Sequence, residues 1–184
     1  MGPGTSDEMQ GLDRRQLFKN LAFLGSATSA VVMGAPLPAL ARGGPASPAE
    51  LKRIKTGYEE IVAFLADFDA QTTVCKPECA RNPDAVRTVL GLRDTKATLF
   101  QIEKVLSKAQ DNVEDADDFE KYIQATEDWS SAVAESNSLS YTSSFGEYNP
   151  GGGKDAVEKY LQKSKEYVVL AKDSLKIICD VLQI

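Results

Sequence analysis

Residues 154–184 read KDAVEKYLQKSKEYVVLAKDSLKIICDVLQI, and this stretch is the strongest indicator of the fold. Its apolar residues recur in steps of three and four, which is the spacing of one face of an α-helix. The stripe consists of Val157, Tyr160, Leu161, Val168, Ala171, Leu175, Ile178 and Leu182. The pattern predicts one long amphipathic helix that runs from Lys154 almost to Ile184.

A long connection is predicted ahead of this helix. Residues 149–153 read NPGGG, which is a strong helix breaker. The serine-rich stretch 136–153 is therefore predicted to be a loop that carries Leu139, Tyr141, Phe145 and Tyr148. Upstream, an acidic turn (111–118) precedes a predicted helix that ends near Ser136, with an inward face made of Phe119, Tyr122, Ile123, Trp129 and Val133.

Two further helices are predicted nearer the N-terminus. Helix 48–73 starts at an N-cap serine followed by a first-turn proline, and its apolar face contains Leu51, Ile54, Tyr58, Ile61, Val62, Leu65 and Phe68. Helix 83–110 opens at Pro83, and a kink is expected near Gly91. No segment alternates with period two, so no sheet of consequence is expected. Four amphipathic helices predict an all-α, up-down-up-down four-helix bundle over residues 42–184.

Residues 1–41 are predicted to be a cleaved targeting segment. Arg14 and Arg15 precede a weak apolar stretch that Pro36 and Pro38 interrupt. This stretch is too short and too weakly apolar for a permanent membrane anchor. Small residues at Ala39 and Ala41 suit a signal peptidase that cuts after Ala41. The arginine pair resembles a twin-arginine signal, which a receptor reads as an export address.

The composition argues against several classes of function. The chain contains no histidine, which removes Ser-His and Cys-His catalysis and most zinc, haem and di-iron sites of helical bundles. The predicted core stripes contain no paired carboxylates for acid–base chemistry. A net charge of −6 argues against a nucleic-acid partner. We therefore expect a binding protein that is not an enzyme and holds no cofactor or metal.

The cysteines predict one disulfide. In an exported protein, Cys75 and Cys79 are close enough in sequence to form a structural disulfide. A redox-active pair is the alternative, but that motif normally has two residues between its cysteines. Cys179 is expected at the opposite end of the bundle as a buried free thiol.

The acidic run 111–120 is interpreted as a solvated turn, because it lacks the glycine and the spacing of a calcium loop.

Two readings remain open for the aromatic residues of the predicted loop. Tyr141, Phe145 and Tyr148 either fold back over the end of the bundle or form a docking surface of the kind that is enriched at interfaces. In the docking reading, basic residues near the start of the mature chain contribute charge that steers a partner: Arg42, Lys52, Arg53 and Lys55.

Three features together resemble one known family. They are the arginine-pair signal that ends in Ala39-Leu40-Ala41, the histidine-free bundle, and the run YNPGGGKDAVEKYL at residues 148–161. They resemble the PsbQ-like extrinsic subunits of photosystem II, and among these the algal branch that includes the fifth extrinsic subunit of diatoms. The Cys75–Cys79 loop has no counterpart that we can match in the green-plant members.

The resemblance implies a location and a set of partners. A member of this family would lie in the chloroplast thylakoid lumen, peripheral to the membrane, and would bind the lumenal core of photosystem II and its other extrinsic subunits. It would support the retention of calcium and chloride in the oxygen-evolving complex, and thereby water oxidation, without binding the manganese cluster itself. The alternative from another class is an exported bacterial helical-bundle ligand carrier or enzyme of unknown substrate.

Overall fold

The computed structural model describes residues 44–148 and 152–184, and these residues are mostly helical. The predicted signal segment, with Arg14, Arg15, Ala39 and Ala41, lies outside the described residues, and so does Arg42. The described residues confirm the prediction that the chain is mostly helical, and they add one small sheet. Its elements are α1 (Pro48–Ala66), α2 (Phe68–Gln71), β1 (Thr73–Cys75), β2 (Cys79–Arg81), α3 (Asp84–Val89), α4 (Ile102–Ala109), the 3₁₀ turn η1 (Gln110–Asn112), α5 (Ala116–Ser144) and α6 (Lys154–Leu182).

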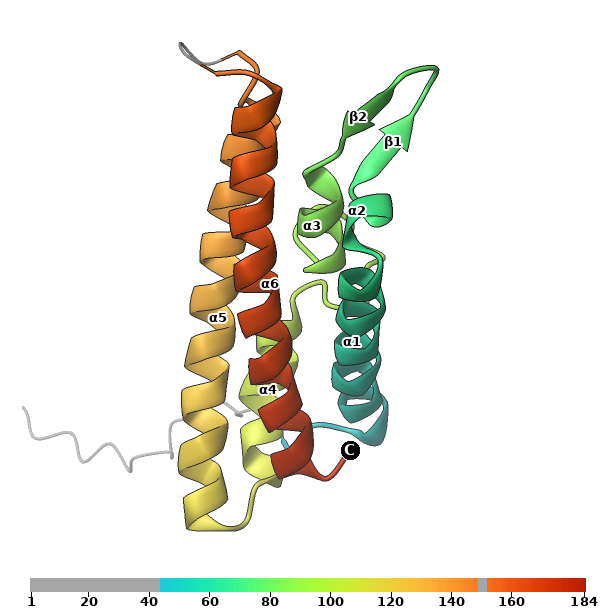
Figure 1. Cartoon of the computed structure of the whole chain (residues 1–184). Coiled ribbons are helices and arrows are strands. Elements are labelled where there is room, and N and C mark those ends of the chain that lie inside the picture. Colours follow the sequence, from blue (N-terminus) through green and yellow to red (C-terminus); the bar gives the residue numbers. More distant parts are fainter. Residues whose placement is uncertain (1–43, 149–151) are drawn as a thin grey trace, which may run out of the picture. The chain divides into compact units, whose positions relative to one another are not determined.

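The two longest helices, α5 and α6, lie antiparallel and pack against each other along their length (Figure 1). Helix α1 packs against α6 on its other side, and α3 and α4 follow one another in the direction opposite to α1. The hairpin β1–β2 lies at the end of the molecule where α5 passes into α6, and the C-terminus lies at the other end. None of the helices in the described ranges is long and apolar enough to cross a membrane.

Helix α1 begins where the sequence predicts it and ends earlier than predicted. Ser47 forms a capping box with Glu50, in which each side chain accepts a hydrogen bond from the backbone N–H of the other residue. The helix stops at Ala66, because Asp67 leaves the helical conformation (φ −131°, ψ 41°), and the short helix α2 follows. The predicted single helix 48–73 is therefore wrong beyond residue 66.

The predicted helix 83–110 is wrong as one element, because residues 90–101 break it completely. Gly91 adopts a left-handed conformation (φ 77°), and a β-carbon there would lie 2.3 Å from the carbonyl carbon of Leu99. This turn lets the buried Leu99 pack against Gly57 of α1. Arg53 holds the same segment from α1, because its guanidinium donates to the carbonyl oxygens of Thr98 and Phe100.

The predicted loop 136–153 is also wrong over its first half, because α5 continues to Ser144. Three of its serines lie on the buried side of α5, where small side chains let α6 approach closely. The hydroxyls of Ser136 and Ser140 lie 2.9 and 2.7 Å from that of Ser164 on α6, and Ser143 donates to the carbonyl oxygen of Val157. These hydrogen bonds satisfy buried polar groups that would otherwise destabilise the interface.

The hydrophobic core lies between α1, α4, α5 and α6, and Trp129, Tyr122, Ile54, Leu106 and Leu175 are among its fully buried side chains. Two residues assigned to inward faces are exposed instead, Val62 on α1 and Phe119 in the first turn of α5. The small antiparallel sheet pairs Thr73 with Arg81 and Cys75 with Cys79. This sheet was not predicted, because strands of three residues are too short to produce an alternating pattern.

Candidate functional site

Three aromatic side chains lie exposed at the end of α5, and we call them the aromatic cluster: Tyr141, Phe145 and Tyr148. Their exposed fractions are 54%, 46% and 82%. Tyr141 and Phe145 are one helical turn apart, and their ring centroids are 4.9 Å apart. Because α5 continues through residues 136–144, Tyr141 lies on a helix and Phe145 at its C-cap, so only Tyr148 belongs to the connection that follows.

Helix α3 holds the aromatic cluster in place through Arg87. The Arg87 guanidinium lies over the Tyr141 ring, with its carbon 5.6 Å from the ring centroid. The same group donates to Asn137 of α5 at 2.8 Å and pairs with Asp84 at 2.9 Å. Its orientation is therefore fixed from both helices, and it fixes the orientation of Tyr141.

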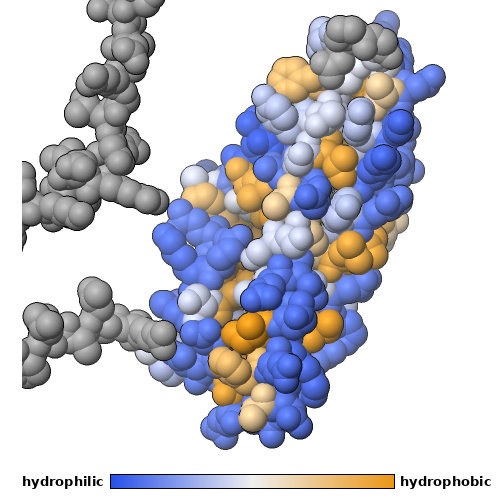
Figure 2. All heavy atoms as spheres, turned by 90° about the vertical axis from the view of Figure 1, so that its left-hand side faces the viewer, coloured by the Kyte–Doolittle hydropathy of each residue, from blue (hydrophilic) through white to orange (hydrophobic). Residues whose placement is uncertain are grey.

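Of the two readings of the aromatic residues, the exposed fractions favour the docking surface. A residue that covers the end of a core is itself buried, whereas all three of these side chains are exposed. Figure 2 views the molecule from the side of α5, where apolar residues form small separate patches among hydrophilic ones. Grouped exposed aromatic side chains on such a surface are a feature of binding sites.

The basic residues predicted to share this docking surface lie elsewhere. Lys52, Arg53 and Lys55 are in the first half of α1, at the end of the molecule away from the aromatic cluster (Figure 1). Lys52 and Lys55 are exposed, whereas Arg53 is half-buried and donates hydrogen bonds to carbonyl groups of segment 90–101. The structure therefore does not bring the two predicted halves of the docking surface together.

Arg53 instead lines a groove that the sequence did not reveal, and we call this the basic groove. It has a volume of about 600 Å³ between α1, α4 and segment 95–101, and its charged residues are Glu50, Arg53, Lys96, Lys104 and Lys108. Glu50 pairs with Lys108 at 2.7 Å, so the remaining charge is positive in a chain whose net charge is −6. The groove could not be predicted from the sequence, because residues 90–101 were expected to be part of a helix.

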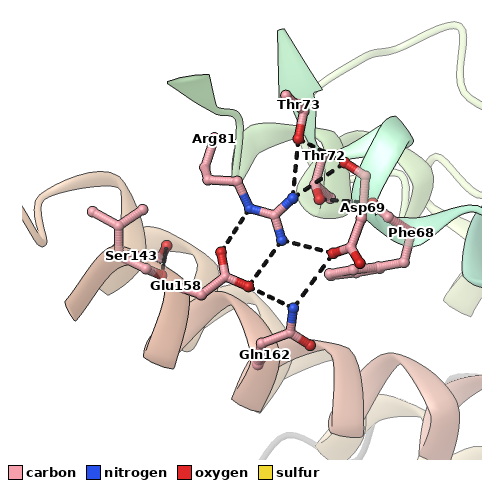
Figure 3. A network of polar contacts seen from close by, with 9 residues as sticks. Phe68, Asp69, Thr72, Thr73, Arg81, Ser143, Glu158 and Gln162 are labelled. Atoms are coloured by element: carbon pink, nitrogen blue, oxygen red, sulfur yellow. Dashed lines mark hydrogen bonds and ion pairs between the residues drawn. The ribbon is translucent and has the colours of Figure 1, made fainter. Parts of the chain in front are cut away.

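A polar network ties the hairpin to α6 near the aromatic cluster (Figure 3). Arg81 of β2 pairs with Asp69 of α2 and with Glu158 of α6, each at 2.8 Å. It also donates to the Thr73 hydroxyl at 3.0 Å, and Gln162 donates to Glu158 at 2.7 Å. The guanidinium lowers the pKa of the Asp69 carboxyl through their hydrogen bond. Arg81 thus connects β2 to the nearby α2 and to α6, which is 77 residues away in sequence.

Between the hairpin and the start of α6 lies a second cleft, which we call the hairpin cleft. Its volume is about 610 Å³. One wall is formed by residues 78–81 and 83, and the other by residues 143, 144, 147, 148, 154, 155, 157 and 158. Tyr148 of the aromatic cluster lines this cleft, so the two features adjoin.

The cysteines are placed as the spacing indicated. A disulfide joins Cys75 and Cys79 across the hairpin, and Cys179 is a buried free thiol on α6. Burial is the main cause that raises the Cys179 pKa to about 11, so the group is a poor nucleophile. In residues 44–148 and 152–184, no group of three or more His, Cys, Asp or Glu side chains is placed to hold a metal ion.

Comparison with known proteins identified no relative. No protein-family model matches this chain, and neither a curated protein nor a solved structure matches it.

Proposed function

We propose that this protein is an exported binding subunit that attaches to the lumenal face of photosystem II and supports calcium and chloride retention there. It would act without a catalytic centre, peripheral to the thylakoid membrane of the chloroplast, in contact with the lumenal core and other extrinsic subunits. The arginine-pair signal and the run at residues 148–161 support the location. The aromatic cluster is the observation that carries the binding role.

We further propose that the long helices and the α3–α4 segment form an up-down-up-down four-helix bundle with an interrupted second leg. In this description α1, α5 and α6 are the first, third and fourth legs, and α3 followed by α4 is the interrupted second leg. The apolar faces of these helices pack against one another inside the bundle. This packing would make the bundle a rigid support for contacts at its two ends. The aromatic cluster at one end and the basic groove at the other would then be two separate contact regions.

The aromatic cluster supports a binding role for energetic reasons. Exposed tyrosine and phenylalanine contribute large contact areas at protein interfaces and lose few rotamers on binding. Arg87 already fixes the position of Tyr141, so little further ordering is needed at that residue. The alternative, an exported bacterial ligand carrier or enzyme, would place its function in a pocket, and of the aromatic cluster only Tyr148 lines the hairpin cleft.

A triple variant tests the proposal. Tyr141→Ala, Phe145→Ala and Tyr148→Ala together should leave the melting temperature nearly unchanged, since all three side chains are exposed. Rebinding to salt-washed photosystem II membranes should weaken about tenfold or more, as for the loss of an interface hot spot. Oxygen evolution should fall in parallel, and added calcium or chloride should partly restore it.

A double variant provides the matched control. Leu170→Ala and Ile177→Ala remove two exposed apolar side chains from α6, and rebinding should be unchanged. Normal rebinding of the triple variant would refute the role of the aromatic cluster. If the wild-type chain never sediments with photosystem II membranes, the photosystem assignment itself fails and the carrier reading gains support.

A further inference from the structure

The hairpin β1–β2 is held rigidly although it buries little of its own surface. Residues 74–80 are all exposed. A two-stranded hairpin alone is marginally stable in water. Here the disulfide closes its tip, and Arg81 fixes its base to α2 and α6 (Figure 3). An exposed element held in one conformation is prepared for binding, because the entropy of ordering it is already lost.

The register leaves one edge of β2 free to bind another strand. Asn82 donates to the carbonyl of Thr72 and Lys76 to that of Glu78, so the hydrogen-bonded pairs fall at 72–82, 74–80 and 76–78. The N–H and C=O groups of Cys79 and Arg81 therefore point away from β1. Among the described residues, none of these four groups has a hydrogen-bond partner.

That free edge borders the hairpin cleft, and the cleft is acidic. Strand β2, and not β1, lines it and lies on the side toward α6 (Figure 1). Its charged residues are Glu78, Arg81, Glu147, Lys154, Asp155 and Glu158. Because Arg81 is neutralised by Asp69 and Glu158, the carboxylates of Glu78, Glu147 and Asp155 outnumber the one remaining cation, Lys154.

We infer that the hairpin cleft binds an extended, lysine- or arginine-bearing segment of a partner protein, which adds as a strand to the free edge of β2. The main chain of the segment would bond to Cys79 and Arg81, the mode known as β-augmentation. Its basic side chains would face Glu147 and Asp155, and Tyr148 would cover its end. Such a segment would bind whether or not the protein works at photosystem II.

A synthetic strand tests this inference on the full chain. The probe is an end-blocked peptide of alternating lysine and valine, about eight residues long, which exceeds the length of β2. It should bind in a fluorescence anisotropy titration and slow the hydrogen exchange of the Cys79 and Arg81 amides, measured by NMR. A peptide with glutamate in place of lysine should not bind, and neither should one with consecutive N-methylated residues, which cannot pair along the edge.

Charge variants separate the cleft from the general surface charge. Glu147→Lys with Asp155→Lys should weaken peptide binding about five- to tenfold, as for the loss of two exposed charge pairs. Glu135→Lys with Glu166→Lys changes the net charge equally at exposed sites outside the cleft lining and should change affinity less than about twofold. Reduced, alkylated protein should bind the peptide more weakly than the oxidised form, because it lacks the disulfide that holds the tip of the hairpin together.

Three results would overturn the inference. One is that the lysine–valine peptide does not bind at millimolar concentration. Another is that it binds without protecting the Cys79 and Arg81 amides, which would exclude strand addition. The third is that both amides are already protected in the free protein while sedimentation shows a dimer, in which case a second copy of this chain occupies the edge.

Discussion

At the residue scale, two arginines hold together elements that the helical pattern of the sequence does not relate to one another. Arg81 joins β2, α2 and α6, and Arg87 joins α3 to α5. Neither arginine was singled out from the sequence, because their partners lie up to 77 residues away. The N-cap of α1 and the disulfide were predictable, since Ser47, Cys75 and Cys79 act on residues close in sequence.

Glu50 should make folding stability depend on pH in acid. Its hydrogen bonds to Lys108 and Ser47 lower the Glu50 pKa from 4.5 to about 2. Between those values the unfolded chain binds more protons than the folded one, so stability rises with pH through this window. The contribution is complete above pH 4.5 and is lost as the pH falls toward 2.

Urea unfolding of wild type and Glu50→Gln measures this dependence. The variant should be less stable than wild type at pH 6, and the difference should shrink toward zero near pH 2, the folded-state pKa. The control is Glu59→Gln on an exposed part of the same helix, which should follow the wild-type curve. A gap between wild type and Glu50→Gln that stays constant from pH 6 to pH 2 would contradict the assignment.

Cys179 should be inert in the folded protein. Its pKa of about 11 leaves roughly one thiol in a thousand ionised at pH 8, and the side chain is buried. Iodoacetamide should therefore leave the native, non-reduced protein unmodified, as judged by intact mass, and add one group in denaturant. Rapid modification of the native protein would mean that the C-terminal end of α6 opens readily.

At the scale of elements, α6 was predictable, whereas the interrupted helices and the end of α5 were not. Helix α6 begins at the predicted residue, because its apolar stripe and the preceding NPGGG are local signals. The break at residues 90–101 depends on Leu99 fitting against Gly57, a contact across 42 residues. The extension of α5 through Ser144 depends on hydroxyl partners in α6, although the spacing of Ser136, Ser140 and Ser143 is itself helical.

A substitution at Gly57 tests its contact with Leu99, which lies in the break between α3 and α4. A β-carbon there would lie 2.2 Å from Leu99 Cδ2 and 2.7 Å from its Cγ. Gly57→Ala should therefore destabilise the protein by about 1–3 kcal/mol, the usual cost of overpacking, although alanine favours helix formation. In a Leu99→Ala background the clash is absent, and the same substitution should stabilise by up to about 1 kcal/mol.

Urea denaturation of the wild type, the two single variants and the double variant gives the coupling energy directly. Leu99→Ala alone should cost about 2–5 kcal/mol, as for other buried leucines. Additive effects of the two substitutions would show that Gly57 and Leu99 do not meet. In that case the break between α3 and α4 would need another cause, for which the left-handed Gly91 is the next candidate.

At the scale of the whole molecule, the candidate contact regions lie at opposite ends. The aromatic cluster and the hairpin cleft adjoin where α5 passes into α6, and the basic groove lies beside the first half of α1. Composition and motifs predicted aromatic and basic residues as candidates for docking. They could not predict which of these residues share a surface, because that depends on how the interrupted second leg folds.

The proposed attachment to a membrane complex should therefore be sensitive to salt at the end that carries the basic groove. At about 1 M salt the screening length is about 3 Å, so charge contacts at an exposed interface lose most of their strength. Washing membranes with strong salt should release the protein. Lys96→Glu with Lys104→Glu should lower the salt concentration needed for release, because both residues line the groove.

Lys159→Glu with Lys163→Glu is the matched control, since both lysines are exposed on α6 and neither lines the basic groove. The released fraction, measured by immunoblot across a salt series, should shift only for the groove variant. An equal shift for both variants would mean that net charge alone governs attachment. No shift for either, with release only by detergent, would assign the attachment to the aromatic end, where screening has little effect on apolar contacts.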